Sequence, residues 1–254
     1  AAISKRLIER GENVIGIDNF SEYYDINLKK ARIKRINNSA LKSSGKWNFF
    51  NISIEDKSRL NDITDIFSPD IIINLAAQAG VRYSLDHPDQ YLNTNLVGFG
   101  NILEICKKHC VENFIYASSS SVYGGNKKLP FKESDSVDHP ISLYAATKKA
   151  NEVMAHSYSH LFKIPSIGLR FFTVYGPWGR PDMAPMIFAK SILQKLPIKV
   201  FNNGNMFRDY TYIDDVIDAI ESCCYKPAIK NSNFNFLDPS PESSFAPHMI
   251  FNVG

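Results

Sequence analysis

The strongest constraint on the fold is a regular alternation between short apolar runs and longer amphipathic segments. Runs rich in isoleucine, valine and phenylalanine predict strands at 13–18, 47–52, 70–77, 113–118 and 166–172. The segments between them predict helices near 3–10, 27–37, 56–67, 90–109 and 144–162. Strands that alternate with crossover helices form parallel sheets, and nearly continuous apolar runs indicate strands that are covered on both faces. The sequence therefore predicts an α/β fold built on a doubly wound parallel sheet.

Two local signals refine this organisation. Ser53 followed by Asp56 resembles a start signal for the third helix, with an acidic side chain that reaches back toward free backbone N–H groups. After about residue 175 the chain changes character, because VYGPWGRPDMAP is rich in proline and glycine and the later segments are shorter and more mixed. We therefore expect a smaller second region that packs on the sheet.

Composition and charge argue against several classes of partner. The net charge of +3 is small for 254 residues and no block of lysine and arginine stands out, so we expect neither nucleic acid nor an anionic membrane as a partner. No apolar run approaches the ~20 residues that span a bilayer, and the first residues lack the apolar segment of a signal peptide, so we expect a cytoplasmic protein. The cysteines have neither CxxC spacing nor disulfide-scaffold density, and we interpret all four as reduced: Cys106, Cys110, Cys223 and Cys224.

Asp18 ends a predicted strand and is a candidate cofactor residue. In doubly wound folds that bind NAD, an acidic residue at the end of the second strand binds the ribose hydroxyls, about 20 residues after a glycine-rich phosphate loop. Counting back from Asp18 places that loop at or before Ala1, and none of the 13 glycines forms it. We therefore expect the natural protein to be longer at its N-terminus, and also beyond the final FNVG. The alternative is that Asp18 is only a turn residue before Asn19.

The stretch SLYAATKK places Tyr144 and Lys148 one helical turn apart. A tyrosine pKa of about 10 must fall by about 3 units, or about 4 kcal/mol, before the side chain can act as a base near neutral pH. A lysine ammonium on the same helix face supplies part of that stabilisation, and an oxidised nicotinamide ring adds more. The pair therefore suits proton transfer, although an aromatic ring packed on an aliphatic stem gives the same spacing.

A run of serines follows the fourth predicted strand. ASSSSVYG occupies 117–124, where the strand ends. Because ligands of open α/β sheets bind outside the carboxyl ends of the strands, hydroxyls there are placed to bond a substrate oxygen. A plain loop is the alternative.

These motifs together resemble the extended short-chain dehydrogenase/reductase family. The resemblance rests on YAATKK, on the serine run that ends in VYG, and on three longer stretches: LAAQAGVRYS at 75–84, RFFTVYGPWGRPDM at 170–183 and FRDYTYIDDV at 207–216. Within the family the motifs are most similar to those of UDP-glucuronate 4-epimerases. The resemblance implies a Rossmann-like, NAD-binding domain at 1–174 and a nucleotide-sugar-binding region at 175–254 that is interleaved with the sheet.

The resemblance also implies roles for individual residues. Tyr144 would be the acid/base, Lys148 would lower its pKa and bond the nicotinamide ribose, and Ser119 would bond the reacting oxygen, a task that Ser120 and Ser121 lie close enough to share. Asn51 stands where many relatives have an aspartate, and its carbonyl still accepts a bond from adenine. The NAD-binding residues implied are Asp18, Asn51, Ile52, Leu75, Ala76, Ala77, Asn95, Ala117, Ser118, Tyr144, Lys148, Phe171 and Val174.

By the same resemblance the substrate is a UDP-sugar. Arg208 would hold the diphosphate, Thr173 and Arg180 would hold a uronate carboxylate, and Arg82 would lie near the cofactor and sugar. The implied reaction oxidises C4 of the sugar, lets the 4-keto sugar turn over and reduces it on the other face, which interconverts UDP-glucuronate and UDP-galacturonate. The helices near 90–109 and 144–162 would form a homodimer interface.

Several alternatives remain open at this point. Sugar 4,6-dehydratases and UDP-glucuronate decarboxylases carry an acidic residue just before VYG, where this chain has Ser120 and Ser121, and UDP-glucose 4-epimerases have an asparagine in place of Thr173. A catalytically inactive NAD-binding protein is the non-enzymatic alternative. His156 and His160 have the spacing of a helical zinc site, but HSYSH lacks the glutamate of HExxH, so we expect no metal.

Overall fold

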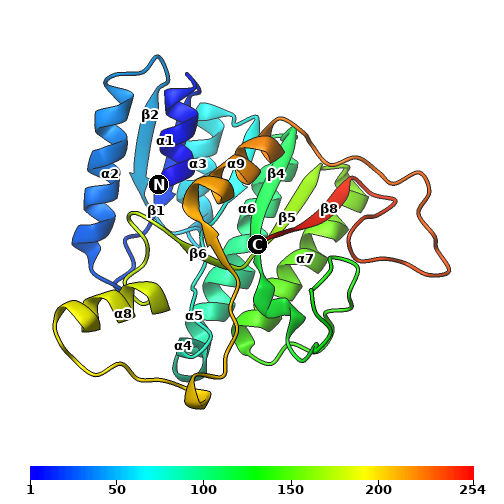
Figure 1. Ribbon diagram of the computed structural model, residues 1–254. Coiled ribbons are helices and arrows are strands. Elements are labelled where there is room, and N and C mark those ends of the chain that lie inside the picture. The colour runs from blue at the N-terminus through cyan, green and yellow to red at the C-terminus, as the bar shows by residue number, and fades with distance from the viewer.

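The computed structural model describes residues 1–254 (Figure 1). The strands are β1 (Val14–Asp18), β2 (Trp47–Asn51), β3 (Ile71–Asn74), β4 (Asn113–Ser119), β5 (Ser166–Phe171), β6 (Thr173–Tyr175), β7 (Tyr210–Tyr212) and β8 (His248–Val253). The α-helices are α1 (Ala2–Glu9), α2 (Ile26–Ala40), α3 (Lys57–Phe67), α4 (Tyr83–Asp86), α5 (Pro88–Leu92), α6 (Phe99–Lys108), α7 (Leu143–Phe162), α8 (Ala184–Leu193) and α9 (Ile213–Cys224). Three shorter helical segments are η1 (Asn93–Gly98), η2 (Ser120–Tyr123) and η3 (Asn202–Gly204).

All paired strands run parallel, which confirms the predicted α/β class with parallel sheets. The largest sheet has the order β3-β4-β5-β8, and β1-β2 and β6-β7 form two smaller parallel pairs. In the register of β4 and β5, Ser119 lies opposite Phe171, and in that of β1 and β2, Asp18 lies opposite Asn51. The carboxyl ends of these paired strands therefore lie level, and the residues that follow them meet at one edge.

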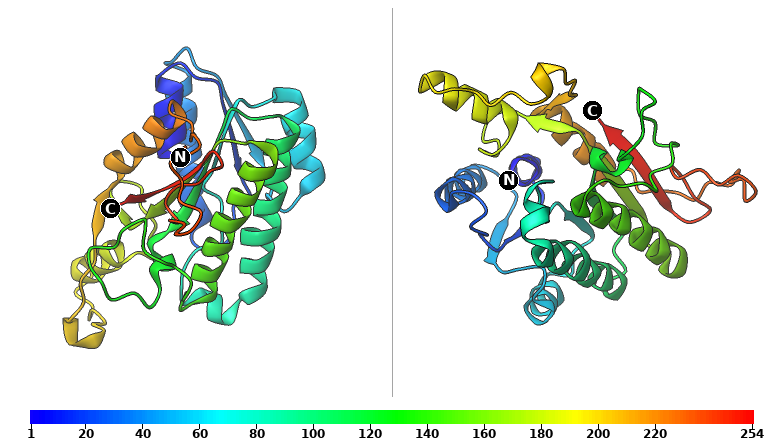
Figure 2. Two further views of the ribbon diagram at one scale, coloured as in Figure 1. Left: turned by 90° about the vertical axis from the view of Figure 1, so that its right-hand side faces the viewer. Right: turned by 90° about the horizontal axis from the view of Figure 1, so that it is seen from below.

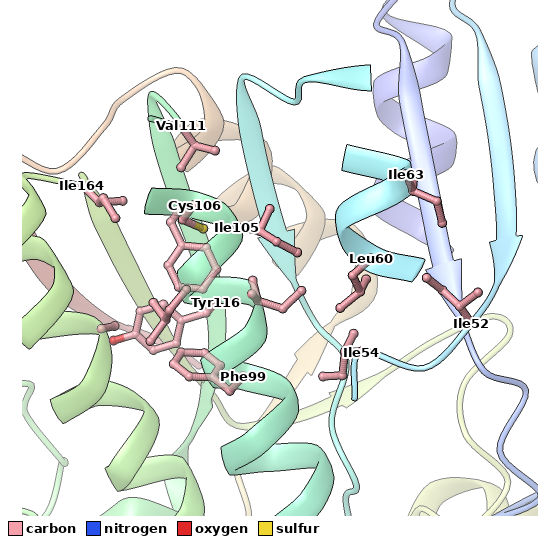
Figure 3. Packing of buried hydrophobic residues seen from close by; sticks show 14 of the residues in the cluster. Ile52, Ile54, Leu60, Ile63, Phe99, Ile105, Cys106, Val111, Tyr116 and Ile164 are labelled. Carbon is pink, nitrogen blue, oxygen red and sulfur yellow. The ribbon is translucent and has the colours of Figure 1, made fainter. Parts of the chain in front are cut away.

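Helices cover the central sheet on both faces, and alternate side chains of β4 contact the helices on opposite faces. Phe114 and Tyr116 face a cluster built with α3, α6 and α7, whereas Ile115 between them faces a cluster built with α1 and α9. Side chains on a strand alternate between faces, so an unbroken apolar run supplies both clusters. Figure 2 shows the two helical layers, and Figure 3 shows the first cluster, where Phe99 and Tyr116 contact edge to face with ring centroids 5.5 Å apart.

One predicted strand is too long, and the structure adds detail to two of the predicted helices. The strand predicted at 70–77 ends at Asn74, and the apolar residues 75–77 continue as a loop. The helix predicted at 90–109 is α5, a π-helical turn and α6 in succession. The third helix, predicted at 56–67, is α3 with Asp56 as its N-cap, and the Asp56 carboxylate accepts a hydrogen bond from the Arg59 N–H at 3.1 Å. A cap of this kind satisfies one of the free N–H groups of the first turn.

Residues 175–254 contribute to the central sheet as well as to the surface. Strand β8 pairs with β5, and α9 packs Val216, Ile217 and Ile220 against β4 and β5. Helix α8 has no buried residue and projects from the end of the molecule where the strands β1–β5 finish (Figures 1 and 2). None of the helices combines the length and the apolar character that crossing a membrane requires.

Candidate active site

Tyr144 lies in the first turn of α7, directly after the helix cap. Ser142 accepts a hydrogen bond from the Ala145 N–H at 3.1 Å, and this fixes the start of the helix beside the end of β4. Burial raises the pKa of Tyr144 above 10, while a hydrogen bond with the Ser119 hydroxyl and the positive charge of Arg180 act in the opposite direction. The structure thus brings three predicted site residues together, although they come from three separate segments of the chain.

Lys148 lies one turn further along α7 and is buried against the last residues of β4. Its Nζ donates a hydrogen bond to the Ala117 carbonyl at 2.8 Å, and burial lowers its pKa to about 8. The cation that lowers the pKa of Tyr144 in this arrangement is Arg180, whereas the sequence had assigned that effect to Lys148. Lysine has three N–H donors, so two remain available to a ligand.

The four serines take different roles. Ser119 Oγ accepts bonds from the Ser121 N–H at 3.2 Å and the Ser121 hydroxyl at 2.9 Å, so Ser121 supports Ser119 from behind. Ser118 is buried and donates to the Glu152 carboxylate at 2.5 Å, so its side chain is not available to a cofactor. Ser120 makes no side-chain hydrogen bond within the protein. Ser119 is therefore the serine that the structure places against Tyr144.

Asn95 fixes the loop after β3 to α7. Its amide oxygen accepts from the Gln78 N–H at 2.8 Å, and its amide nitrogen donates to the Gln78 carbonyl at 3.1 Å and to Thr147 at 3.0 Å. Asn151 returns a bond to the Asn95 carbonyl at 2.6 Å. Asn95 lies in the π-helical turn, a feature that often occurs at functional sites. The predicted bracing residue thus connects a loop, a bulged helix and the helix that carries Tyr144.

Most of the residues predicted to bind NAD lie at or just after the carboxyl ends of β1 to β5, whereas Asn95, Tyr144 and Lys148 lie on helical segments. Asp18 is half exposed, and one carboxylate oxygen accepts from the Phe20 N–H at 2.8 Å. Leu75 is exposed and Ala76 and Ala77 are partly exposed, so the loop offers an apolar surface with small side chains. Ile52 is the exception, because its side chain is buried in the core beside α3.

An NAD molecule fits this donor set. The buried ammonium of Lys148 has N–H groups without a protein partner, which is the arrangement that a ribose diol satisfies. The half-exposed Asp18 carboxylate likewise suits the second ribose.

The predicted substrate residues are distributed unevenly. Thr173 begins β6, and Arg180 follows in the loop before α8, where its guanidinium binds Asp182 at two points. Arg82 and Arg208 are exposed, and neither contacts another site residue: Arg82 stacks on Phe201 at 4.1 Å from the ring centroid, and Arg208 donates only to the neighbouring Phe207 carbonyl.

Two groups of functional interest were absent from the sequence predictions. The first is Asp182 with Tyr23, whose hydroxyl donates a hydrogen bond to Asp182 at 3.1 Å. The motif RPDM could have pointed to Asp182, because it stands two residues after Arg180, but no motif in the sequence points to Tyr23. The second group is the ion pair of Arg170 and Glu152, both buried, whose side chains lie 2.9 Å apart behind the serine run.

The histidines of the alternative zinc site are engaged otherwise. His156 lies 2.7 Å from the Ser244 hydroxyl and contacts the ring of His248. Nowhere in residues 1–254 do three or more histidine, cysteine, aspartate or glutamate side chains lie close enough to hold a metal ion.

Parallel α/β layers with a tyrosine, a lysine and a serine gathered at the end of β4 define the class of short-chain dehydrogenases/reductases. The chain belongs to the NAD dependent epimerase/dehydratase family, whose family model matches residues 1–235. This membership confirms the family resemblance and, at the level of the family, the cofactor prediction.

Individual relatives agree with this placement. Protein CapI of Staphylococcus aureus is 51% identical over 254 residues, which cover 99% of this chain and 74% of that protein. A probable UDP-glucuronate 4-epimerase of Rhizobium meliloti is 44% identical over 256 residues, which cover 99% of this chain and 73% of that protein. The crystal structure of the UDP-glucuronic acid 4-epimerase from Bacillus cereus in complex with UDP-glucuronic acid and NAD has a TM-score of 0.79 and 30% identity, over 100% of this chain and 73% of that one.

Proposed function

We propose that this protein is an NAD-dependent 4-epimerase that interconverts UDP-glucuronate and UDP-galacturonate through a 4-keto sugar. The observation that carries the proposal is the position of Arg180, whose charge acts on Tyr144 and whose guanidinium keeps free donors for a carboxylate. A site for neutral sugars needs no such cation beside the base. The relatives described as UDP-glucuronate 4-epimerases support the same substrate.

The proton chemistry follows from the residues at the end of β4. Tyr144, as phenolate, takes the proton of the sugar 4-hydroxyl, and the Ser119 hydroxyl bonds the same oxygen. Lys148 stays fixed to the Ala117 carbonyl and orients the ribose of the cofactor with its remaining N–H groups. Lys148 and Asp18 would hold NAD, which would supply the hydride acceptor for oxidation at C4 and the hydride donor for reduction on the opposite face. Tyr144 then gives the proton back to the new 4-hydroxyl.

The same residues separate the proposal from its rivals. Neither Ser120 nor Ser121 can act as the additional acid/base that dehydratases and decarboxylases use. UDP-glucose 4-epimerase is the nearer competitor, and Thr173 together with Arg180 favours the uronate over it. Within the proposal, residues 1–174 hold NAD and residues 175–254 supply Arg180 and Arg208 to the UDP-sugar.

A homodimer is part of this proposal. Helices α5 to α7 lie side by side, with the Tyr158 hydroxyl donating to Glu104 at 2.5 Å. Their outer faces expose apolar side chains that the sheet does not cover: Leu92, Val97, Val153, Leu161 and Phe162. Exposed apolar patches of this kind favour association.

The decisive experiment is product analysis. Purified protein is incubated with UDP-glucuronate and no added reductant, and the nucleotide sugars are separated by anion exchange and identified by mass and NMR. UDP-galacturonate is expected. UDP-xylose or an accumulating keto sugar would contradict the proposal. Tyr144→Phe should lose turnover, whereas the control Tyr225→Phe, at an exposed tyrosine beside α9, should keep it.

A further inference from the structure

Arg180 is held by a contact between two loops that are far apart in the sequence. Its Nε donates to Asp182 Oδ1 at 3.0 Å, and its Nη2 donates to Asp182 Oδ2. The same Oδ2 accepts the Tyr23 hydroxyl at 3.1 Å. Tyr23 belongs to the loop after β1, and the other two residues to the loop between β6 and α8. Asp182 therefore connects the arginine of the proposed site to the cofactor side of the molecule.

Tyr23 is itself fixed by close packing. Gly80 has a φ of +105°, and a Cβ at that position would lie 2.5 Å from the Tyr23 hydroxyl oxygen, so only glycine leaves room for this hydroxyl. The Tyr23 ring packs edge to face on Tyr83 with centroids 4.9 Å apart. Tyr91 donates to the Gly80 carbonyl at 2.5 Å and contacts the Tyr144 ring with centroids 6.2 Å apart. A continuous series of contacts thus runs from Asp182 to the proposed acid/base.

The pairing with Asp182 uses only part of the guanidinium. Asp182 engages Nε and one N–H of Nη2, and the guanidinium also lies over the Tyr23 ring, 5.4 Å from its centroid, so Tyr23 holds Arg180 directly as well as through Asp182. The N–H groups of Nη1 make no hydrogen bond with Asp182. Both side chains are about 30% exposed, at 30% for Arg180 and 31% for Asp182, so the ion pair is partly withdrawn from water. An arginine without this partner would sample several rotamers, and a ligand would have to restrict them on binding.

We propose that Asp182, held by Tyr23, is a positioning residue that fixes the free edge of the Arg180 guanidinium on the carboxylate of a bound UDP-uronate. The proposal rests on the proposed function and extends it, because it assigns the restraint of the carboxylate to a loop-to-loop contact. Asp182 does not touch the sugar in this arrangement. It acts through Arg180.

Restraint matters because the 4-keto sugar is a β-keto acid. If its C5–C6 bond turns perpendicular to the C4 carbonyl plane, that bond breaks and CO2 leaves. The bonding electron pair passes to the C4 carbonyl as an enolate, which takes a proton at C5, and the hydride removed earlier remains on NADH. A carboxylate held by a fixed Arg180 is kept out of that alignment. The fraction of oxidised sugar that loses CO2 therefore reports how well Arg180 is positioned.

The test compares Asp182→Asn and Tyr23→Phe with the wild type and with Asp62→Asn, a control at an exposed aspartate of α3. Each protein is incubated with UDP-glucuronate. The amounts of UDP-galacturonate, of released CO2 and of the resulting UDP-pentose products are measured in the same reaction, which gives the CO2 fraction. Binding of UDP-glucuronate and of UDP is measured separately by calorimetry. Asp182→Asn should raise KM for UDP-glucuronate about tenfold, keep UDP affinity within about twofold, and raise the CO2 fraction several-fold. Tyr23→Phe should also raise KM for UDP-glucuronate and the CO2 fraction, but by smaller factors.

The outcomes decide the inference separately from the proposed function. A folded Asp182→Asn protein with unchanged KM and CO2 fraction overturns it, and so does an equal loss of UDP-glucuronate and UDP affinity. If Asp182→Asn does not fold, Tyr23→Phe alone decides by the same criteria. If the wild type makes no UDP-galacturonate, the proposed function has failed, and calorimetry still decides whether Asp182 supports carboxylate binding: a loss specific to UDP-glucuronate supports it, and any other pattern overturns it.

Discussion

The Lys148 ammonium donates a 2.8 Å hydrogen bond to the Ala117 carbonyl at the end of β4, and no carboxylate lies within ion-pair distance of it. The buried amine is therefore stabilised by a dipole rather than by a counter-ion. Burial of an unpaired charge disfavours the charged form, which is why the pKa of Lys148 falls to about 8. Lys148, which we propose to bind the cofactor, is therefore held at a cost in folding stability.

Lys148→Met should abolish epimerisation and stabilise the fold. The folded pKa of about 8 lies below the ordinary value of 10.5, so the folded chain binds this proton less tightly than the unfolded chain. The destabilisation is full below pH 8 and disappears as the pH rises from about 8 to 10.5. The variant should therefore gain about 3 kcal/mol at pH 7, and the gain should shrink through that window. Urea unfolding at pH 7 and pH 10 measures the gain in stability and its decrease with pH. A gain that does not change with pH would show that the Lys148 charge is not its cause.

Arg180→Gln should move the pH dependence of turnover. The positive charge of Arg180 lowers the pKa of Tyr144 against the effect of burial, so its removal raises that pKa. The base form is then populated only at higher pH, and the acid limb of kcat should move upward. The measurement is kcat from pH 6 to pH 10 at saturating UDP-glucuronate, with Arg59→Gln, an exposed residue of α3, as the matched control. An unmoved limb would show that Arg180 does not set the protonation of the base.

Much of the fold could be predicted from apolar patterns, and the failures have physical causes. Strand β4 was predicted to within one residue because both its faces are buried and its sequence is correspondingly apolar. Residues 75–77 are apolar too, but they follow the last paired residue of β3 as an exposed loop that lines the site, so the pattern extended the strand too far. The π-helical turn at Asn93–Gly98 is defined by its backbone hydrogen bonds, which apolar spacing does not report, so the pattern predicted one uniform helix.

The site was predictable to the extent that its residues lie in long motifs. Tyr144, Lys148 and Ser119 were found because spacing or position at a strand end carries a chemical reason. The environment of Arg180 was not, since Tyr23 lies 159 residues from Asp182 and only the folded chain brings them together. The individual roles of Ser118, Ser119 and Ser121 also required the structure, because four identical side chains in a row give no information about which one is buried.

A charge on the outer face of α7 should separate the proposed dimer. Val153 and Leu161 are 57% and 62% exposed on this helix, and each would be buried in a helix-to-helix interface. Val153→Glu should place a charge in the apolar contact and yield monomers by light scattering at micromolar concentration. Leu41→Glu, at an 86% exposed position after α2, is the control and should leave the mass unchanged. A wild-type protein that is already monomeric would contradict the proposal.

The buried pair of Arg170 and Glu152 should contribute to stability in a way that depends on both partners. Arg170 is fully buried and donates to both Glu152 oxygens, at 2.9 Å and 3.0 Å, and to the Tyr123 hydroxyl at 3.0 Å. Removing one partner leaves a buried charge without compensation, so Glu152→Leu should cost roughly 3–5 kcal/mol in the free energy of unfolding.

The double variant Glu152→Leu/Arg170→Met should recover a large part of that loss, because it leaves no unpaired charge and fills a similar volume. The remaining deficit reports the hydrogen bonds that Ser118 and Tyr123 lose with the pair. Urea unfolding of the two variants measures the difference. The control is Lys108→Ala, which breaks a half-exposed ion pair with Asp65 and should cost much less than Glu152→Leu. If the double variant were less stable than Glu152→Leu, Arg170 would still be stabilising without Glu152, and the argument from an unpaired buried charge would be wrong for this site.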